Sequence, residues 1–286
     1  MGLAFRLTNL VFAAGLTLAV SVGAVSAQST PFEPKVGQDG KDVVWVPTAQ
    51  DLVDRMLVMA KVTPQDYVID LGSGDGRTVI TAAKLGVKAH GIEYDEKLVE
   101  LSKQNAAKAN VSDKATFAKA DIFESDFSQA TVITMFLLEQ LNLKLRPTLL
   151  GLKPGTRLVT NTFKMGDWKS DAAVELKSGC TTYCNAYLWI VPAQVAGEWQ
   201  VVHEGENAAG PVALKLVQEF QEVSGTAEPV NGKAAEVAMS VTGAEISFKV
   251  GGGEYKGKVE GDSATGTYRL AGRDGVWKGT RVKATK

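Results

Sequence analysis

Two kinds of apolar pattern alternate between residues 43 and 195. Short segments that are predicted as strands occur at residues 68–71, 89–93, 115–119, 131–136, 157–161 and 187–191. Between them lie segments with helical spacing of apolar residues, at 77–85, 95–109 and 141–150. Such alternation is typical of a parallel sheet with helices on both faces. The pattern therefore predicts an α/β fold with a doubly wound, mostly parallel sheet.

A further helix is predicted ahead of the first strand. Thr48 and Asp51 have the spacing of a capping box, in which the Thr48 side chain would open the helix. The following apolar residues fall on one helical face; they are Leu52, Val53, Met56 and Leu57.

After about residue 196 the helical pattern disappears and strict alternation takes over. Short strands are predicted at 213–223, 236–241, 246–250, 255–259, 267–270 and 276–282, with glycine-rich turns between them. We therefore expect residues 196–286 to form a small antiparallel β domain, a meander that closes into a barrel or a sandwich. No motif in it indicates a function.

The N-terminal 27 residues have the pattern of a secretory signal peptide. Arg6 precedes an apolar run at residues 10–20, and small residues before Gln28 suit cleavage after Ala27. An uncleaved membrane anchor is the alternative, although polar residues and glycines weaken the run as a span. The sequence predicts an exported, periplasmic or envelope-associated protein. Residues 28–42 are polar, with prolines and glycines, and are expected to form a flexible lead to the domain at 43–195.

Composition excludes some classes of function. The formal net charge of the 286-residue chain is −1, so no basic excess exists to neutralise a nucleic-acid backbone. The chain has only two histidines, His90 and His203, so zinc is not indicated and no metal is expected. Cys180 and Cys184 are compatible with a local disulfide or with two reduced thiols.

The most informative segment is residues 67–76, where an apolar strand ends in Asp70 and runs into Gly72, Gly74 and Gly76. Glycines at these positions allow tight turns with positive φ and let a ligand approach the backbone. Glu93 ends the next strand, 93 − 72 = 21 residues after the first glycine. An acidic side chain at this distance suits the hydroxyl groups of a ribose.

Two nucleoside ligands fit such a loop. A dinucleotide would place its pyrophosphate there, where the carboxylates of Asp70 and Asp75 would repel it. S-adenosylmethionine has no phosphate and carries two cationic groups, which these carboxylates attract. The Gly-x-Gly-x-Gly spacing also differs from the dinucleotide fingerprint. The sequence thus favours S-adenosylmethionine.

With these residues in place, residues 43–192 resemble the class I S-adenosylmethionine-dependent methyltransferases, which have a Rossmann-like sheet. The similarity is greatest to a subgroup of membrane-associated protein-lysine methyltransferases that includes the enzyme of the mitochondrial ATP synthase c-subunit. Three segments carry the resemblance, at residues 45–48, 70–77 and 121–123. The resemblance implies that the cofactor is held by Thr48, Asp70, Gly72, Ser73, Gly74, Gly76, Glu93, Asp121 and Ile122.

One departure from related families narrows the choice of methyl acceptor. The Asn-Pro-Pro-aromatic motif of methylases that act on adenine is absent after the fourth strand, where residues 133–138 stand instead. Adenine in nucleic acid is therefore disfavoured as acceptor, and the resemblance implies a protein substrate, one that is membrane-associated in the resembling subgroup.

The candidates to orient the acceptor are Asp75, Asn161 and Tyr183. Aromatic residues suited to line an acceptor channel are Trp45, Phe136, Phe163 and Trp168. Core packing is the plainer interpretation of such aromatics, and His90 within a strand is expected to be a hydrogen-bonded core residue.

Three hypotheses follow. The first is an active methyltransferase that acts on protein lysine. The second is a non-catalytic exported binding or structural protein that keeps the nucleoside-binding fold, because S-adenosylmethionine is made in the cytosol whereas the N-terminus predicts export. The third, a nicotinamide oxidoreductase, is disfavoured by Asp75 in the loop.

Overall fold

A computed structural model describes residues 1–2, 32–205, 210–229 and 233–283. Residues 3–27 of the predicted signal peptide and its cleavage site lie outside these residues. Among the residues described, no helix is long and apolar enough to cross a membrane.

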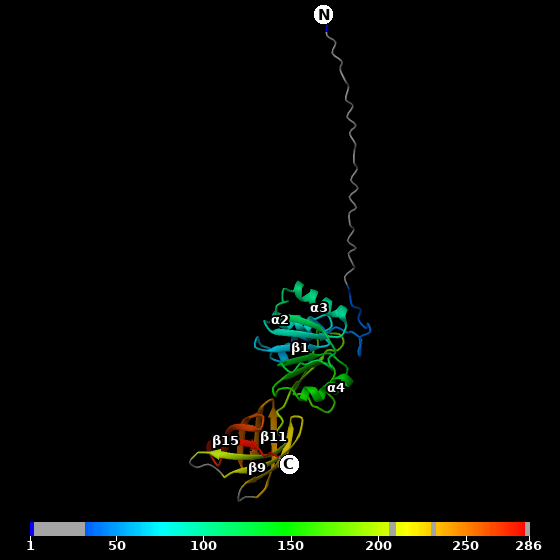
Figure 1. Cartoon of the computed structure of the whole chain (residues 1–286). Helices are drawn as coiled ribbons and strands as arrows, with labels where there is room; N and C mark the ends of the chain where they lie inside the picture. The colour runs from blue at the N-terminus through cyan, green and yellow to red at the C-terminus, as the bar shows by residue number, and fades with distance from the viewer. Residues whose placement is uncertain (3–31, 206–209, 230–232, 284–286) are drawn as a thin grey trace. The chain divides into compact units, whose positions relative to one another are not determined.

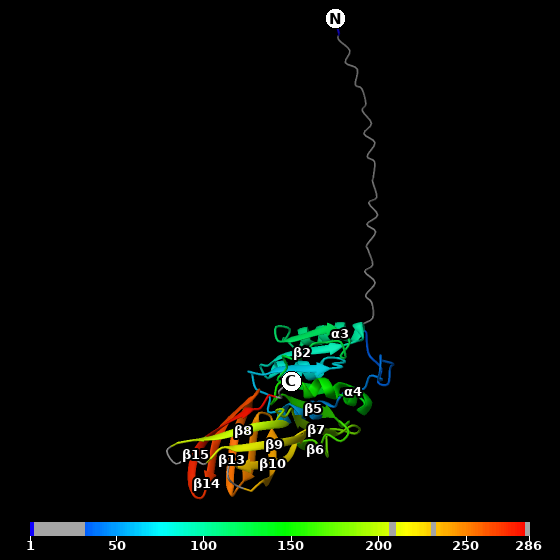
Figure 2. The same ribbon diagram turned by 60° about the horizontal axis from the view of Figure 1, so that its bottom comes forward.

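The first part of the fold is a seven-stranded sheet in the order β3-β2-β1-β4-β5-β7-β6 (Figures 1 and 2). Its parallel strands are β1 (Tyr67–Leu71), β2 (Lys88–Glu93), β3 (Ala115–Lys119), β4 (Val132–Met135) and β5 (Arg157–Asn161). At one edge β7 (Asn185–Ile190) runs antiparallel to β5, and β6 (Ala172–Glu175) runs antiparallel to β7. The predicted doubly wound, mostly parallel α/β sheet is confirmed, although β6 was not predicted.

Helices cover both faces of this sheet, because successive residues of its buried strands point to opposite sides. Val68 of β1 packs in one core with α1 (Gln50–Met59), α2 (Arg77–Lys84) and α3 (Glu96–Lys108). Ile69, the next residue, packs in the other core with α4 (Glu139–Leu150). Figure 1 labels α2, α3 and α4 around the sheet.

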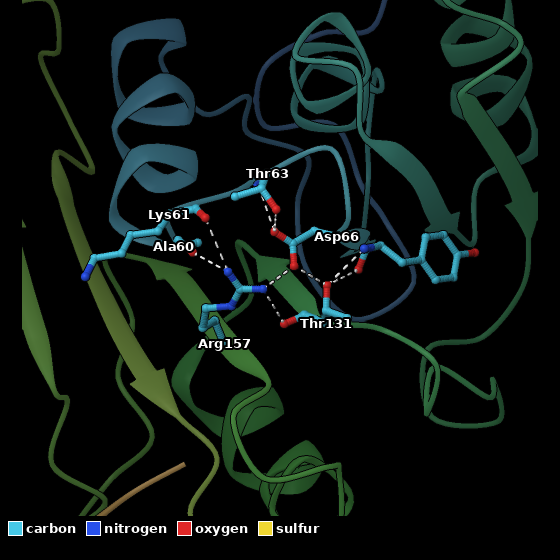
Figure 3. A network of polar contacts seen from close by, with 7 residues as sticks. Ala60, Lys61, Thr63, Asp66, Thr131 and Arg157 are labelled. Atoms are coloured by element: carbon cyan, nitrogen blue, oxygen red, sulfur yellow. Dashed lines mark hydrogen bonds and ion pairs between the residues drawn. The ribbon is translucent and has the colours of Figure 1, made fainter. Parts of the chain in front are cut away.

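A polar network connects the amino ends of β1, β4 and β5, at the end of the sheet where these strands begin (Figure 3). The Arg157 guanidinium forms an ion pair with Asp66 and donates to the carbonyl of Ala60, 2.8 Å away, at the end of α1. The hydroxyl of Thr131 donates to the same Asp66 carboxylate over 2.7 Å, and the backbone N–H of Thr63 donates over 2.8 Å. Burial alone would raise the pKa of Asp66, but these hydrogen bonds outweigh it and lower that pKa.

The second part of the fold is a closed barrel of eight antiparallel strands, in which β8 pairs with both β15 and β9 (Figure 2). Its strands are β8 (Gly197–Glu204), β9 (Val212–Glu219), β10 (Glu222–Pro229), β11 (Ala235–Thr242), β12 (Glu245–Val250), β13 (Gly253–Glu260), β14 (Ser263–Leu270) and β15 (Arg273–Arg281). Aromatic side chains fill its interior; Phe248 and Tyr255 stack with their centroids 4.7 Å apart, and Trp277 is 2% exposed. The predicted antiparallel β domain is thus a barrel.

Two details of the barrel differ from the prediction. Residues 213–223, predicted as one strand, form a hairpin of β9 and β10 that turns at Phe220, whose φ is +54°. The strand β8 was not predicted.

Cys180 and Cys184 form a disulfide in the loop between β6 and β7, so of the two predicted possibilities the structure has the bridge and not two reduced thiols.

Candidate active site

A cavity opens at the carboxyl ends of β1, β2 and β4. The strand order reverses between β1 and β4, and this switch point is where open α/β sheets bind ligands. The chain turns that follow β1 to β5 supply most of its wall, residues 38–48 supply a further part, and Met56 and Tyr183 also line it. We call residues 37–48 the strap.

The glycine loop after β1 forms the floor of this cavity. Gly74 has φ +55°, and a Cβ there would lie 2.7 Å from Nε1 of Trp45 in the strap. Gly76, with φ +82°, precedes α2 as its N-cap, and a Cβ there would lie 2.8 Å from the ring of Phe117. Gly72 and Gly74 line the cavity, whereas Gly76 does not and acts through the close packing of α2.

Asp70 lies at the end of β1 and is 6% exposed. Its carboxylate accepts a hydrogen bond of 2.6 Å from the hydroxyl of Thr134 on β4. Burial raises the pKa of Asp70 to about 7, the nearby charges of Glu93 and Asp75 add to this, and the hydroxyl donors Thr134 and Thr78 oppose it. A charged Asp70 carboxylate without a partner therefore costs free energy. A cation bound beside Asp70 would offset that cost.

Glu93 at the end of β2 holds the glycine loop in place. One carboxylate oxygen accepts from the backbone N–H of Gly74 over 2.8 Å. The other accepts from the N–H groups of Tyr94 and Asp95, over 2.8 and 3.0 Å. A carboxylate has about four lone-pair sites, so Glu93 keeps acceptor capacity toward the cavity it lines.

Asp121, after β3, forms an ion pair with Lys41 of the strap. This hydrogen bond, joined by one of 2.9 Å from the N–H of Phe123, lowers the pKa of Asp121, and it raises the pKa of Lys41. The Lys41 ammonium also lies 4.8 Å from the ring centroid of Tyr94. Ile122 lines the cavity beside Asp121. Residues 38–42, expected in the flexible lead, thus form part of the wall.

Thr48 does not cap α1 as predicted. The N-cap residue is Ala49, which has no side chain suited to capping. The hydroxyl of Thr48 instead accepts a hydrogen bond of 3.1 Å from the side-chain amide of Asn161 at the end of β5. Its carbonyl accepts from Arg77 over 2.8 Å. Thr48 still lines the cavity, and the capping prediction failed because a partner 113 residues away in sequence holds the side chain.

The three predicted orienting residues have different surroundings. Asp75 lines the cavity, but the Arg77 guanidinium pairs with both of its oxygens, the shortest contact being 2.6 Å. Asn161 is fully buried and does not line the cavity, so it positions Thr48 and does not face an acceptor. Tyr183 lines the cavity and is 43% exposed.

Aromatic rings gather at the end of the cavity next to Tyr183. The Tyr183 ring meets that of Phe136 edge-on at 5.2 Å and that of Phe163 at 6.1 Å, centroid to centroid. Trp45, also predicted for the channel, lies over the glycine loop. Trp168 does not line the cavity; it is buried against Phe220, with centroids 5.7 Å apart.

His90, expected in the core, is half-buried and hydrogen-bonds to Thr116 over 2.8 Å.

The cavity suits S-adenosylmethionine. Besides the glycine floor, it contains the hydroxyl of Ser73, which is buried and has no hydrogen-bond partner within the described chain. Its charged lining residues are predominantly acidic: Asp39, Asp42, Asp70, Asp75, Glu93, Asp95 and Asp121, against Lys41 and Arg77. Such a wall attracts a ligand with sulfonium and ammonium groups and repels a pyrophosphate. No group of residues that could hold a metal ion is found in the described part of the chain.

Sequence reasoning gave no role to several wall residues. Arg77 lies in the segment 70–77 and received no role of its own, although its place directly after the glycine loop is a usable signal. Lys41 and Tyr94 carry no comparable signal, because their contact joins two turns that are far apart in the sequence. Leu137 and Leu138 complete the wall after β4.

Comparison with known proteins agrees with this geometry. Residues 70–172 match the model of the ANTKMT methyltransferase domain. A protein-lysine N-methyltransferase of Saccharolobus islandicus is 41% identical over 152 residues, which cover 52% of this chain and 94% of that protein. The human lysine N-methyltransferase of the ATP synthase c-subunit is 31% identical over 58% of this chain and 68% of its own length.

A solved structure is similar as well. The crystal structure of an RNA methyltransferase from Salinibacter ruber, in complex with S-adenosyl-L-homocysteine, is 44% identical to this chain, with a TM-score of 0.50. The match covers 52% of this chain and 96% of that one. With a glycine floor and an acidic cavity at the switch point of the sheet, the chain is an S-adenosylmethionine-dependent methyltransferase and belongs to the family that includes the protein-lysine N-methyltransferase of Saccharolobus islandicus.

Proposed function

We propose that this methyltransferase acts on the ε-amine of lysine in a protein substrate. The acidic character of the cavity carries the proposal. Seven carboxylates and two cationic side chains line it, so the wall attracts a cationic side chain such as lysine. Two of the carboxylates, Asp39 and Asp42, are exposed on the strap, where an approaching substrate would meet them first.

The cofactor would lie over the glycine loop, with Asp70 and Ser73 near its methionine part, Glu93 near its ribose and Asp121 with Ile122 near its adenine. When bound, S-adenosylmethionine supplies a methyl group on a sulfonium, which is electrophilic. The protein's own contribution is to align the acceptor and to exclude water, because a positioned pair of reactants needs little further catalysis. Asp75, neutralised by Arg77, is suited to orientation and not to removal of the proton.

An RNA acceptor is the alternative, because the similar Salinibacter ruber structure is described as an RNA methyltransferase. The same charges argue against it. A phosphate backbone would be repelled by the carboxylates of the wall, and the net charge of −1 offers no compensating basic surface. The named lysine methyltransferases among the relatives also favour protein. None of these relatives supports a non-catalytic binding protein.

The test is transfer of a labelled methyl group from S-adenosylmethionine to poly-L-lysine, to cell-envelope extract and to total RNA. We expect label on the first two and none on RNA, and label confined to RNA would overturn the proposal. Asp39→Asn with Asp42→Asn should raise the KM for poly-L-lysine about two- to fivefold, more strongly at low salt, because exposed charges act weakly and are screened. The control is Asp113→Asn, an exposed carboxylate outside the cavity, which should leave KM unchanged.

We also propose that the enzyme works outside the cytosol, as its N-terminal pattern predicts. The disulfide between Cys180 and Cys184 supports this, because disulfides persist mainly in oxidising compartments. The test is a reporter fused after Lys286 that is active only outside the cytosol. Reporter activity is expected, and an inactive reporter on a fully expressed fusion would refute export.

A further inference from the structure

The loop between β6 and β7 reaches from the edge of the sheet to the cavity. It spans residues 176–184, between the paired residues Glu175 and Asn185. A backbone hydrogen bond of 2.9 Å, from the N–H of Leu176 to the carbonyl of Cys184, closes its base, and the disulfide between Cys180 and Cys184 bridges its C-terminal half. The loop also rests on the first turn of α1, where a Cβ on Gly179 would lie 1.6 Å from a carboxylate oxygen of Asp51. A short bridged loop seated in this way has little freedom to move.

Tyr183 lies inside this bridge and lines the cavity. Its ring contacts Phe136 and Phe163, and these two rings in turn stack with their centroids 6.2 Å apart. The three rings come from three places in the chain: the turn after β4, the turn after β5 and the bridged loop. We call Phe136, Phe163 and Tyr183 the aromatic wall.

The backbone at this wall is held in an unfavourable conformation. Tyr183 has φ +58°, and Thr162, the neighbour of Phe163, has φ +59°. Side chains other than glycine rarely adopt such values, and residues that do so cluster at functional sites where the surroundings enforce them. The carbonyl of Phe163 is fixed by a hydrogen bond of 2.6 Å from the hydroxyl of Thr160 and by one of 3.2 Å from the amide of Asn142. At Tyr183 the disulfide supplies the corresponding constraint.

The aromatic wall lies apart from the elements that hold the cofactor. Asp70, the glycine loop and Glu93 come from the ends of β1 and β2, whereas the wall comes from the turn after β4, the turn after β5 and the loop between β6 and β7. Aromatic faces attract ammonium groups, and the attraction persists when the ammonium carries methyl groups. Such a surface suits lysine and its methylated forms.

We propose that Tyr183, fixed by the Cys180–Cys184 disulfide, selects the acceptor of this enzyme by completing an aromatic wall for the lysine ε-amine and its methylated forms. The inference rests on the proposed lysine methylation. It assigns to the disulfide a role in acceptor use that is separate from cofactor binding.

The experiment compares the wild type with Tyr183→Phe, Tyr183→Ala and the double variant Cys180→Ser/Cys184→Ser. Each protein is first titrated with S-adenosylhomocysteine by calorimetry. The loaded protein is then titrated with the amide of Nε-trimethyllysine, and kcat and KM are measured separately with poly-L-lysine. We expect Tyr183→Ala and the double variant to bind the trimethyllysine amide about tenfold more weakly and to show a similar rise in KM. Tyr183→Phe, which keeps the ring, should resemble the wild type.

S-adenosylhomocysteine affinity should change less than about twofold in every variant, which also shows that each is folded. Adding a dithiol to the wild type should weaken amide binding and raise KM as in the double variant. The dithiol passes two electrons and two protons to the disulfide bridge and is itself oxidised to a disulfide. The same dithiol should not affect the double variant.

The inference is overturned if Tyr183→Ala keeps wild-type binding of the amide and wild-type KM, or if the variants lose S-adenosylhomocysteine to the same extent. Failure of the proposed function has a different signature. The wild type would then bind S-adenosylhomocysteine but transfer no methyl group to poly-L-lysine or to any envelope protein, and the role of Tyr183 in lysine selection would fall with it.

Discussion

Asp70→Asn should make the ligand-free protein more stable while it weakens cofactor binding. In the folded protein the pKa of Asp70 is raised from 3.8 to about 7. At about 1.36 kcal/mol per pKa unit, a charged Asp70 therefore costs up to about 4 kcal/mol above pH 7. Because the folded-state pKa is the higher one, this cost is fully present above pH 7 and disappears as the pH falls toward the unfolded-state value.

The stability prediction follows from that sign. At about pH 7.5 the Asn variant should gain up to about 4 kcal/mol over the ligand-free wild type, and near pH 4 the gain should vanish. Urea unfolding at both pH values measures the difference. The amide keeps an acceptor for Thr134, and its N–H₂ group can donate to the hydroxyl of Thr78, the second partner of this carboxyl.

Binding should respond in the opposite direction. We expect the ammonium of the ligand to pair with ionised Asp70, so the apparent affinity scales with the ionised fraction. That fraction is about 0.75 at pH 7.5 and about 0.03 at pH 5.5 for a pKa of about 7, which makes S-adenosylhomocysteine bind about 25-fold more weakly in acid. Calorimetry on the Asn variant should show weak binding at both pH values.

The control is Asp66→Asn, at the other end of β1, which removes a carboxylate outside the cavity and should keep the 25-fold dependence. Wild-type affinity that is equal at the two pH values would refute the reasoning. So would an Asn variant no more stable than the wild type at pH 7.5.

Three further predictions concern the packing around the site and the barrel. Gly74→Ala would place a Cβ 2.7 Å from Trp45 at a residue with φ +55°. It should weaken S-adenosylhomocysteine binding, measured by calorimetry, at least about tenfold. The control is Gly155→Ala, which has φ +92° but open space around its Cβ and should lower stability without changing binding. Asp66→Asn should lower the free energy of unfolding in urea by about 2 kcal/mol at neutral pH, because it removes the charge that pairs with Arg157. Since the pKa of Asp66 is lowered in the folded protein, this difference should be lost as the pH falls through that value, and a deficit that persists in acid would contradict the assignment. Trp277→Ala, which empties a 2%-exposed position in the barrel, should lower stability by about 3–5 kcal/mol, and a loss below about 1 kcal/mol would show that the barrel core is not tightly packed.

Local patterns predicted the sheet and the cofactor loop because both are written in short stretches of sequence. A buried parallel strand is a continuous apolar run, and the glycines after Asp70 carry their own backbone requirement. The helices were found for the same reason, since each repeats its apolar face within a few residues.

The sequence predictions failed where a residue far away in the sequence, or an unusual turn, determines the local structure. Thr48 has the spacing of a capping residue, yet Asn161 on β5 takes its hydroxyl. The alternation of residues 213–223 continues through Phe220, so nothing in the pattern marks the turn that a positive φ produces there. Asn161 was predicted to orient the acceptor, but its side-chain amide donates to Thr48 of the strap. Lys41 reaches Asp121 across 80 residues, a contact that no local pattern indicates.

The closure of the barrel limits how this part of the chain can recognise other molecules. In the described residues each of its strands pairs on both sides, β9 with β8 and β10 included, so no row of unpaired backbone groups remains as a template for strand addition. The seven-stranded sheet, in contrast, ends in β3 and in the four-residue strand β6. A partner that docks on the barrel must therefore be recognised through side chains and turns, whereas the seven-stranded sheet offers edges that another chain could extend.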